Sequence, residues 1–374
     1  MGRLKLMTIV GTRPEIIRLS EVIKCADKYF DHVFVHTGQN YDYNLKDIFF
    51  EDLELRQPDY YLDAVGDNLG QTMGLIIAKS YELMLEVKPD ALLVLGDTNS
   101  ALSVISAKRL KIPIFHMEAG NRCWDWNVSE MINRKIVDHI SDINLPYTEH
   151  SRRYLISEGI DGKTMFVTGS PMKEVLLKNF EKIKESDVLE RLGLESGRYI
   201  IVSAHREENL DIEDNFMDLM NAINTIAETY QMPVIYSTHP RSAKIIEKHD
   251  FKFHPLVENM HPFGFLDYNK LQMNAFCVLS DSGTLSEESS MLDFPAVLLR
   301  TSTERPEVLD KGTIVVGGIK GEDVKQAIEL ATAMYENNEG VVEANDYADE
   351  NVSAKVVKLI QSYTHIVNKT VWLK

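Results

Sequence analysis

The sequence alternates short apolar runs with helix-patterned segments almost from end to end, and this alternation begins twice. Strands that alternate with helices favour a mostly parallel sheet. In the first half, strands are predicted at Lys5–Val10, His32–His36, Ala91–Leu95, Ile114–Met117, Ile143–Leu145 and Met165–Val167. In the second half, they are predicted at Tyr199–Ser203, Val234–Thr238, Phe253–Leu256, Phe276–Ser280, Ala296–Leu299 and Thr313–Val316. The intervening helices include Glu15–Phe30, Leu69–Val87, Asn99–Leu110, His150–Glu158, Ile212–Thr229 and Thr284–Leu292. We therefore predict an α/β protein with two Rossmann-like, doubly wound domains.

A polar, helix-rich segment, Lys173–Arg198, separates the two sets of strands. We place the first domain at residues 1–172 and the second at 173–351. A helical pattern near the end of the chain, about 352–374, is expected to join the first domain. In such a protein the carboxyl ends of both sets of strands can face one ligand in a cleft between the domains.

Composition excludes several classes of partner. The chain has 374 residues and a formal net charge of −17, which argues against nucleic acid and anionic membrane surfaces. No apolar run of about 18 residues is present, so no transmembrane helix is expected, and the N-terminus resembles a buried strand more than a signal peptide. Three scattered cysteines, Cys25, Cys123 and Cys277, fit a reducing compartment, and we expect a cytoplasmic protein. A nucleophilic role for Cys123 lacks a base partner nearby in the sequence.

Three acidic residues lie where strands of the first domain end or a helix begins. Glu118 closes the strand Ile114–Met117, and Glu130 opens a helix behind Ser129, which we interpret as its N-cap. Asp97 follows the most hydrophobic strand of the domain. Carboxylates at the carboxyl ends of parallel strands are well placed for chemistry. Alternatively, Asp97 caps the next helix, Glu130 supports the helix dipole and Glu118 is solvated.

Polar groups also gather at strand-to-helix turns of both domains. Arg13 follows a glycine at the first turn, and His205 lies in a dense polar cluster after the strand that opens the second domain. Further along, Ser282 and Gly283 begin a helix whose backbone N–H groups can bind an anion, and Glu288 follows on that helix as an acceptor for ribose hydroxyls. This combination describes a nucleoside diphosphate. The sequence has no dinucleotide fingerprint, P-loop or metal-ligand spacing.

With these motifs in view, the whole chain resembles the non-hydrolysing UDP-N-acetylglucosamine 2-epimerase family, which has the two-domain glycosyltransferase-B fold. Seven motifs carry the resemblance: Gly11-Thr-Arg-Pro-Glu15, Gly96-Asp97-Thr98, Glu118-Ala-Gly, Glu130-x-x-Asn133-Arg134, His205-Arg-x-Glu-Asn209, Asp281-Ser282-Gly283 with Glu287-Glu288, and Thr303-Glu-Arg-Pro-Glu307. The resemblance implies four catalytic residues: Asp97, Glu118, Glu130 and His205. It also implies substrate-binding roles for Arg13, Arg134, Arg206, Tyr268, Ser282, Gly283, Glu288 and Arg305. Of these, Glu288 matches the ribose acceptor, and Tyr268 falls near the expected uracil position.

The family inverts C2 of a UDP-amino sugar by expelling UDP from C1, which gives an unsaturated 2-acetamidoglycal, and then adding UDP back. A base must reach C2 on one face of the ring and an acid on the other, which explains the paired carboxylates. Positive charge and N–H donors must stabilise the departing diphosphate. The resemblance implies no metal and no cofactor, a UDP-amino sugar as the partner molecule, and a homodimer.

Departures from the family pattern suggest a particular branch. The tryptophan-bearing loop Asn121–Trp126, with the segment Asn133–Asp142 after it, looks like that of enzymes of capsule and O-antigen synthesis. Those enzymes convert UDP-2-acetamido-2,6-dideoxy-L-talose to UDP-N-acetyl-L-fucosamine. We predict this substrate, with UDP-N-acetylglucosamine and UDP-N-acetylmannosamine as the alternative pair. The loop Thr37–Asp42 differs from that of members activated by a second substrate molecule, so such activation is not expected. A glycosyltransferase of the same fold, a UDP-sugar sensor without catalysis and a hydrolysing epimerase remain as rival interpretations.

Overall fold

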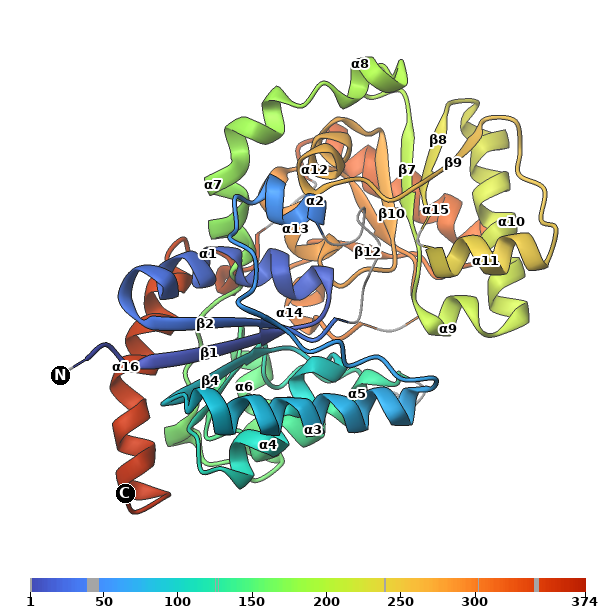
Figure 1. Ribbon diagram of the computed structural model, residues 1–374. Coiled ribbons are helices and arrows are strands. Elements are labelled where there is room, and N and C mark those ends of the chain that lie inside the picture. Colours follow the sequence, from blue (N-terminus) through green and yellow to red (C-terminus); the bar gives the residue numbers. More distant parts are fainter. Residues whose placement is uncertain are drawn as a thin grey trace. The chain divides into compact units, whose positions relative to one another are not determined.

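The computed structural model describes residues 2–38, 47–124, 126, 128–238, 240–301, 303–339 and 343–374 (Figure 1). The chain divides into two compact units. The first unit comprises Met1–Lys178 and Asp346–Lys374, and the second comprises Asn179–Asn345. Our predicted division placed the boundaries at 172/173 and 351/352. The long helix α7 (Met172–Glu185) runs from the first unit into the second.

The first unit contains a six-stranded sheet with the order β3-β2-β1-β4-β5-β6, in which every pairing is parallel. Its strands are β1 (Lys5–Val10), β2 (Asp31–His36), β3 (Tyr60–Tyr61), β4 (Ala91–Leu95), β5 (Ile114–Met117) and β6 (Ile143–Leu145). Its helices are α1 (Arg13–Tyr29), α2 (Asp47–Asp52), α3 (Leu69–Val87), η2 (Asn99–Ser103), α4 (Val104–Arg109), α5 (Glu130–Ile140), α6 (Glu149–Ser157), η3 (Gly162–Thr164) and α16 (Val352–Thr370). The strand order reverses direction between β1 and β4.

The second unit repeats this plan, with the all-parallel order β12-β11-β10-β7-β8-β9. Its strands are β7 (Ile200–Ser203), β8 (Val234–Ser237), β9 (Val257–Met260), β10 (Cys277–Ser280), β11 (Ala296–Leu298) and β12 (Val315–Val316). Its helices are α8 (Val188–Leu192), α9 (Glu207–Leu210), α10 (Glu213–Tyr230), α11 (Pro240–Lys248), α12 (Phe265–Asn274), α13 (Leu285–Leu292), α14 (Pro306–Asp310) and α15 (Gly321–Glu336), and η4 (Asn345–Tyr347) spans the boundary. Here the order reverses between β7 and β10. The predicted fold class, two doubly wound α/β units, is confirmed.

Local signals explain where individual helices begin and end. Thr12 and Glu15 form a capping box at the start of α1, with a proline in the first turn. The Asn68 side chain accepts the Gln71 N–H at the start of α3, and Lys88 ends that helix in the left-handed conformation. The central strands β4 and β5 are buried along their whole length, as expected for a sheet covered by helices on both faces.

Two predicted strands are wrong. Met165–Val167 forms no strand, and its pairing is limited to an isolated parallel bridge between Met165 and Asn144. Phe253–Leu256 is a loop that directly precedes β9. The Phe253 ring packs 6.0 Å from that of Tyr236, so this apolar run fills the core beside the sheet instead of joining it. The predicted helix Asn99–Leu110 is divided into η2 and α4, and the short edge strand β3 was not predicted.

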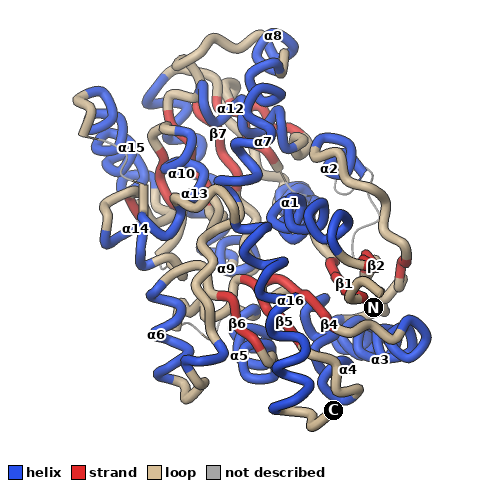
Figure 2. Tube along the Cα trace, turned by 90° about the vertical axis from the view of Figure 1, so that its left-hand side faces the viewer, coloured by secondary structure: helices blue, strands red, loops and turns tan. Residues whose placement is uncertain are grey.

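The last helix, α16, packs against α1 (Figure 2). A buried contact also joins α16 to α7. The Glu174 carboxylate, on α7, accepts hydrogen bonds from both the N–H (2.8 Å) and the hydroxyl of Ser353, on α16. None of the described helices combines the length with the apolar composition that a membrane span needs.

Candidate functional site

In the first unit, the loops after β4 and β5 meet beside the point where the strand order reverses. The Gly96 N–H donates to the Met117 carbonyl (2.9 Å), and a side chain at Gly96 would lie 3.5 Å from Glu118 Oε2. Gly96 has a φ of +70°, and Glu118 itself adopts the left-handed conformation with a φ of +62°. A non-glycine residue there is uncommon and costs about 1–2 kcal/mol, so the surrounding contacts must hold the Glu118 turn in place.

Two side chains fix the Glu118 carboxylate. Arg18, from α1, pairs with Oε2, and Asn121 donates from Nδ2 to Oε1 over 3.0 Å. The Arg18 and Glu118 side chains are both largely buried, with exposed fractions of 10% and 9%. The pairing spans a separation of 100 residues, and Arg18 was absent from the predicted site. The alternative of a solvated Glu118 is therefore wrong.

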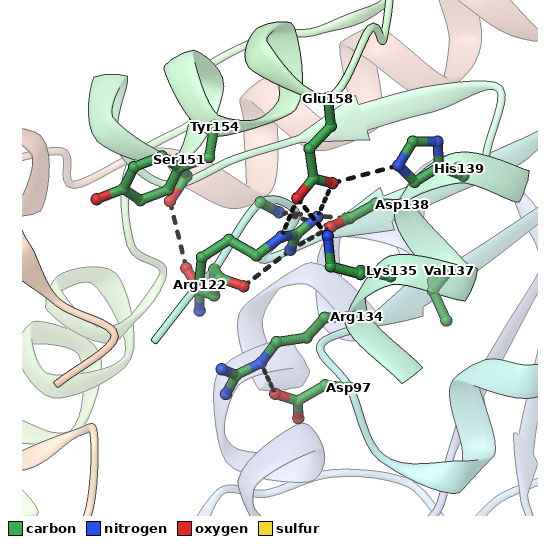
Figure 3. A network of polar contacts seen from close by, with 12 residues as sticks. Asp97, Arg122, Arg134, Lys135, Val137, Asp138, His139, Ser151, Tyr154 and Glu158 are labelled. Carbon is green, nitrogen blue, oxygen red and sulfur yellow. Dashed lines mark hydrogen bonds and ion pairs between the residues drawn. The ribbon is translucent and has the colours of Figure 1, made fainter. Parts of the chain in front are cut away.

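Asp97 is held by the helix that begins at Glu130. Arg134 Nε donates to Asp97 Oδ2 over 2.7 Å (Figure 3). Asn133 Nδ2 donates to the Asp97 carbonyl over 2.9 Å. The helix η2 begins behind Thr98 and has no side-chain cap. The structure thus replaces the predicted capping alternative for Asp97 with an ion pair, and leaves the carboxylate 24% exposed.

Glu130 is the first residue of α5, as predicted, and is partly exposed. Ser129 precedes it but does not cap the helix, because its backbone is helical and no side-chain cap bond forms. Its hydroxyl lies 3.2 Å from Glu130 Oε2 instead. Glu130 and Arg134 are four residues apart on α5, which places them on one face of the helix. Arg134, on that face, forms the ion pair with Asp97.

The β1 turn contains a buried carboxylate that sequence reasoning missed. Glu15 is 1% exposed and accepts hydrogen bonds from the N–H groups of Gly11 (3.0 Å) and Thr12 (2.8 Å) and from the Ser100 hydroxyl. Burial raises its pKa, and these hydrogen bonds oppose the rise. Glu15 therefore ties the β1 turn to η2. Arg13, on the same turn, places its guanidinium 5.4 Å from the centre of the Phe49 ring in α2.

A buried ionic network is centred on Arg122, in the loop that follows β5 (Figure 3). Arg122 is 1% exposed, and it pairs through Nη1 with Asp138 (2.8 Å) and through Nε and Nη2 with Glu158 (2.9 and 2.7 Å). The other carboxylate oxygen of Asp138, Oδ1, lies 3.0 Å from His116 Nδ1. His116 Nε2 forms a hydrogen bond with the Gly96 carbonyl (2.8 Å). This network joins the loops after β4 and β5. We call it the Arg122 network.

Both tryptophans of the loop Asn121–Trp126, Trp124 and Trp126, are largely exposed, with fractions of 58% and 67%. The Lys135 ammonium lies 6.0 and 5.7 Å from the centres of their rings, and Tyr154 meets Trp124 edge-on. Asp125, in the same loop, and most of the predicted loop Thr37–Asp42 lie outside the described residues. Cys123 Sγ lies 3.9 Å from Arg134 Nη1.

In the second unit, Asp281 organises the turn after β7. Its buried carboxylate accepts the backbone N–H groups of His205 (2.9 Å) and Arg206 (2.9 Å) and the Asn209 side-chain amide (3.1 Å). Asp281 Oδ1 also lies 3.4 Å from His205 Nδ1. The imidazole remains 35% exposed, at the carboxyl end of the strand beside the second reversal of strand order. Asp281 directly follows the neighbouring strand β10, so its hydrogen bonds join the turns after β7 and β10.

Ser282 and Gly283 lead into α13, as predicted. The Ser282 N–H donates to the Ser280 hydroxyl (3.1 Å), and the Ser282 hydroxyl lies 2.9 Å from that of Thr284. Arg206 reaches this turn and donates from Nε to the Asp281 carbonyl (3.3 Å). The β7 and β10 turns thus bring a histidine, an arginine and the start of a helix together, a combination suited to an anion.

Three other predicted residues of this unit occupy different surroundings. Glu288 is 8% exposed, and its Oε2 accepts the Gln272 amide (2.8 Å) from α12. Arg305 is 1% exposed and forms an ion pair with Glu287 (2.9 Å), so its guanidinium is engaged in the interior. Tyr268 lies on α12 and is partly exposed. Within the described ranges, no cluster of three His, Cys, Asp or Glu side chains could hold a metal ion.

The fold and the turns define a class: this is a two-domain nucleotide-sugar enzyme of the glycosyltransferase-B type, with two parallel six-stranded sheets. The family described as UDP-N-acetylglucosamine 2-epimerase matches residues 24–361, and the chain belongs to that family. It is therefore an isomerase, a 2-epimerase of a UDP-acetamido sugar.

Three comparisons illustrate the similarity. The structure of UDP-N-acetylglucosamine 2-epimerase from Rickettsia bellii is 46% identical and covers 100% of both chains, with a TM-score of 0.91. The UDP-GlcNAc 2-epimerase of Methanocaldococcus jannaschii, solved in complex with UDP-GlcNAc and UDP, is 32% identical over 96% of this chain and 99% of the other, with a TM-score of 0.89. A curated UDP-N-acetylglucosamine 2-epimerase of that organism is 35% identical over 337 residues, which are 87% of this chain and 92% of the relative. These names favour the alternative substrate pair over the predicted L-talose derivative.

Proposed function

We propose that the enzyme interconverts UDP-N-acetylglucosamine and UDP-N-acetylmannosamine by eliminating UDP and adding it back. The observation that carries this proposal is the 46% identity, along the whole chain, with the protein from Rickettsia bellii that is named UDP-N-acetylglucosamine 2-epimerase. Conversion of UDP-2-acetamido-2,6-dideoxy-L-talose to UDP-N-acetyl-L-fucosamine stays the competing proposal. It is favoured by the tryptophan-bearing loop and by the segment Asn133–Asp142 that follows it.

We assign the proton transfers to Asp97, Glu118 and Glu130. In the forward direction one carboxylate takes the proton from C2, the C1–O bond to UDP breaks, and its electrons leave with the diphosphate while a C1=C2 double bond forms. In the return step the UDP oxygen bonds to C1 and a carboxyl group delivers a proton to the other face of C2. The position of these groups at strand ends and at a helix start, with Glu118 and Asp97 held by arginines, supports this assignment.

The diphosphate is assigned to the second unit. His205, Arg206, Ser282 and the backbone at Gly283 would stabilise the charge that develops on UDP as it leaves, because they combine positive charge with N–H donors at the start of a helix. We assign Glu288 to the ribose hydroxyls and keep Tyr268 as the residue nearest the uracil.

Besides Arg206, three arginines were predicted to bind substrate, and they differ in what supports that role. Arg13 remains assigned to substrate binding, since it stands on the β1 turn. Arg134 is assigned to orienting Asp97, with which it pairs. The buried pairing of Arg305 with Glu287 favours a role in supporting α13 over direct contact with substrate. A homodimer, proposed from the family resemblance, is checked by light scattering of the purified protein.

One experiment separates these interpretations. The enzyme is incubated in D2O with UDP-N-acetylglucosamine and no acceptor, and in parallel with the 6-deoxy-L-talose derivative, and C2 deuteration is followed by NMR. Deuterium at C2 of both glucosamine and mannosamine products supports the proposal. Exchange only in the parallel reaction establishes the competing substrate. UDP binding without exchange points to a sensor or a transferase, and release of free sugar with UDP points to a hydrolysing epimerase.

A further inference from the structure

The turn between β10 and α13 contains a glycine whose small size, not its backbone conformation, is required. Gly283 does not adopt a positive φ, yet a side chain there would lie 2.9 Å from Glu304 Oε1 and 3.7 Å from Arg206 Nη2. The space above the turn is therefore filled by a carboxylate from the loop after β11. This carboxylate has no place in the predicted site.

Glu304 is clamped between two arginines. Its Oε1 accepts Arg206 Nη2 over 2.8 Å, and its Oε2 pairs with Arg300. The side chains of Glu304 and Arg300 are 5% and 1% exposed, whereas Arg206 is 16% exposed. A guanidinium as deeply buried as that of Arg300 is strongly destabilising without its carboxylate. We therefore infer that Glu304 keeps its position, and its pairing with Arg206, when a ligand binds.

Arg206 is held at a second point of its guanidinium. Its Nε donates to the Asp281 carbonyl over 3.3 Å, while the Asp281 carboxylate accepts the Arg206 backbone N–H. At least two of the guanidinium nitrogens thus have fixed partners, beside the turn that leads into α13. A side chain fixed before binding loses less conformational freedom on binding, which strengthens the complex.

We propose that Glu304, braced by Arg300, is a positioning residue that holds the Arg206 guanidinium in place for the diphosphate of the substrate. This inference rests on the proposed assignment of the diphosphate to the second unit. It adds two residues, Glu304 and Arg300, that act on UDP only through Arg206.

A double-mutant cycle on UDP affinity tests the inference. Isothermal titration calorimetry gives the Kd of UDP for the parent and for Arg206→Ala, Glu304→Gln and the double variant. We expect Glu304→Gln to raise the Kd roughly 3- to 10-fold, the cost of ordering one long side chain. We expect Arg206→Ala to raise it about 10-fold or more. The double variant should bind no more weakly than Arg206→Ala, because Glu304 has no effect once Arg206 is gone.

Stability controls keep the test decisive. Ile226→Ala, in the core of α10, should lower the melting temperature of the second unit and leave the Kd of UDP unchanged. If Glu304→Gln does not fold, Arg300→Met combined with Glu304→Leu replaces the buried pair by apolar side chains, which such sites tolerate. It should raise the Kd to the same extent.

The outcomes distinguish the inference from the function on which it rests. A parent protein that does not bind UDP refutes the assigned function and the inference together. If the parent binds and Arg206→Ala weakens binding, the assignment stands. In that case an unchanged or tighter Kd in Glu304→Gln, or effects of the two substitutions that simply multiply, overturns the inference alone.

Discussion

Replacing Arg122 by methionine should sharply destabilise the first unit. Methionine roughly fills the space of the arginine stem with an adaptable apolar chain, so the main loss is the positive charge. That charge is shared by Asp138, at 2.8 Å from Nη1, and Glu158, at 2.7 Å from Nη2. The two carboxylates differ in what they keep after the substitution.

The magnitude follows from their burial. Glu158 is 11% exposed and retains Lys135 and His139 as partners, so its charge stays partly compensated. Asp138 is 0% exposed at its side chain and is left with a backbone N–H and His116. An uncompensated buried charge costs about 3–5 kcal/mol. For a unit of this size each kcal/mol lowers Tm by roughly 2–4 °C, so we expect a decrease of roughly 6–20 °C.

The assay is differential scanning calorimetry, which can resolve the transitions of two units. The matched control is Arg152→Met, since Arg152 pairs with Glu149 at the surface, where the two side chains are 32% and 47% exposed. A pair of that kind contributes about 0–1 kcal/mol, so the control should melt within roughly 4 °C of the parent.

The charge argument also predicts rescue. Adding Asp138→Asn to Arg122→Met removes the stranded carboxylate, so the double variant should melt above the single variant. If Arg122→Met has the same melting temperature as the Arg152→Met control, the buried network contributes no net stability. If the double variant melts below the single one, the cost arises from something other than the stranded charge.

Three further predictions concern the site and its supports. Glu130→Gln should lose most C2 exchange, measured by NMR in D2O, while its Kd for UDP stays within about tenfold of the parent, roughly 1.4 kcal/mol; a larger loss of affinity would make Glu130 a binding or structural residue. Gly120→Ala should lower the free energy of unfolding, measured in urea, by roughly 2–5 kcal/mol, because its φ is +85° and the new side chain would lie 2.5 Å from a backbone carbonyl. The control Gly159→Ala, with a φ of +88° and open space around it, should lower it by only about 1–2 kcal/mol. Equal decreases in the two variants would contradict the steric part of the reasoning. Hydrogen bonds from Arg122 lower the pKa of Glu158 from 4.5 to about 2, so its stabilisation is complete above pH 4.5 and is lost as the pH falls toward 2; Glu158→Gln should flatten the loss of stability in that window, and an unchanged acid profile would refute the shift.

Much of the fold was predictable because buried parallel strands are short, continuous apolar runs. β1, β4, β5 and β6 have the predicted bounds for this reason. The same rule failed at β9, where the strand at the sheet edge is the polar, half-exposed segment Val257–Met260 and the apolar run before it packs as a loop. An apolar run indicates burial, and burial is possible without pairing.

The turns of the candidate site were also predictable, because unusual polar residues directly follow apolar strands. The residues that fix those turns were not. Arg122 and Glu304 are charged residues in loop-like sequence, which ordinarily indicates solvent, and each pairs with a residue far away in the sequence, Glu158 and Arg206 respectively. Glu15 did leave a local signal, the spacing Thr12-x-x-Glu15 of a capping box. Pairings such as that of Arg18 with Glu118 depend on tertiary structure and have no signature in a single sequence.

The return of the chain to the first unit has a consequence for synthesis on the ribosome. The second unit is continuous, so all of it can emerge and fold while the first unit still lacks the stretch from Asp346 onward. Until that stretch arrives, the face of α1 that receives α16 stays uncovered, and the Glu174 carboxylate lacks Ser353. The unit whose synthesis begins first is thus completed only after the second unit, and the nascent chain must keep an apolar helix face away from other chains until α16 emerges.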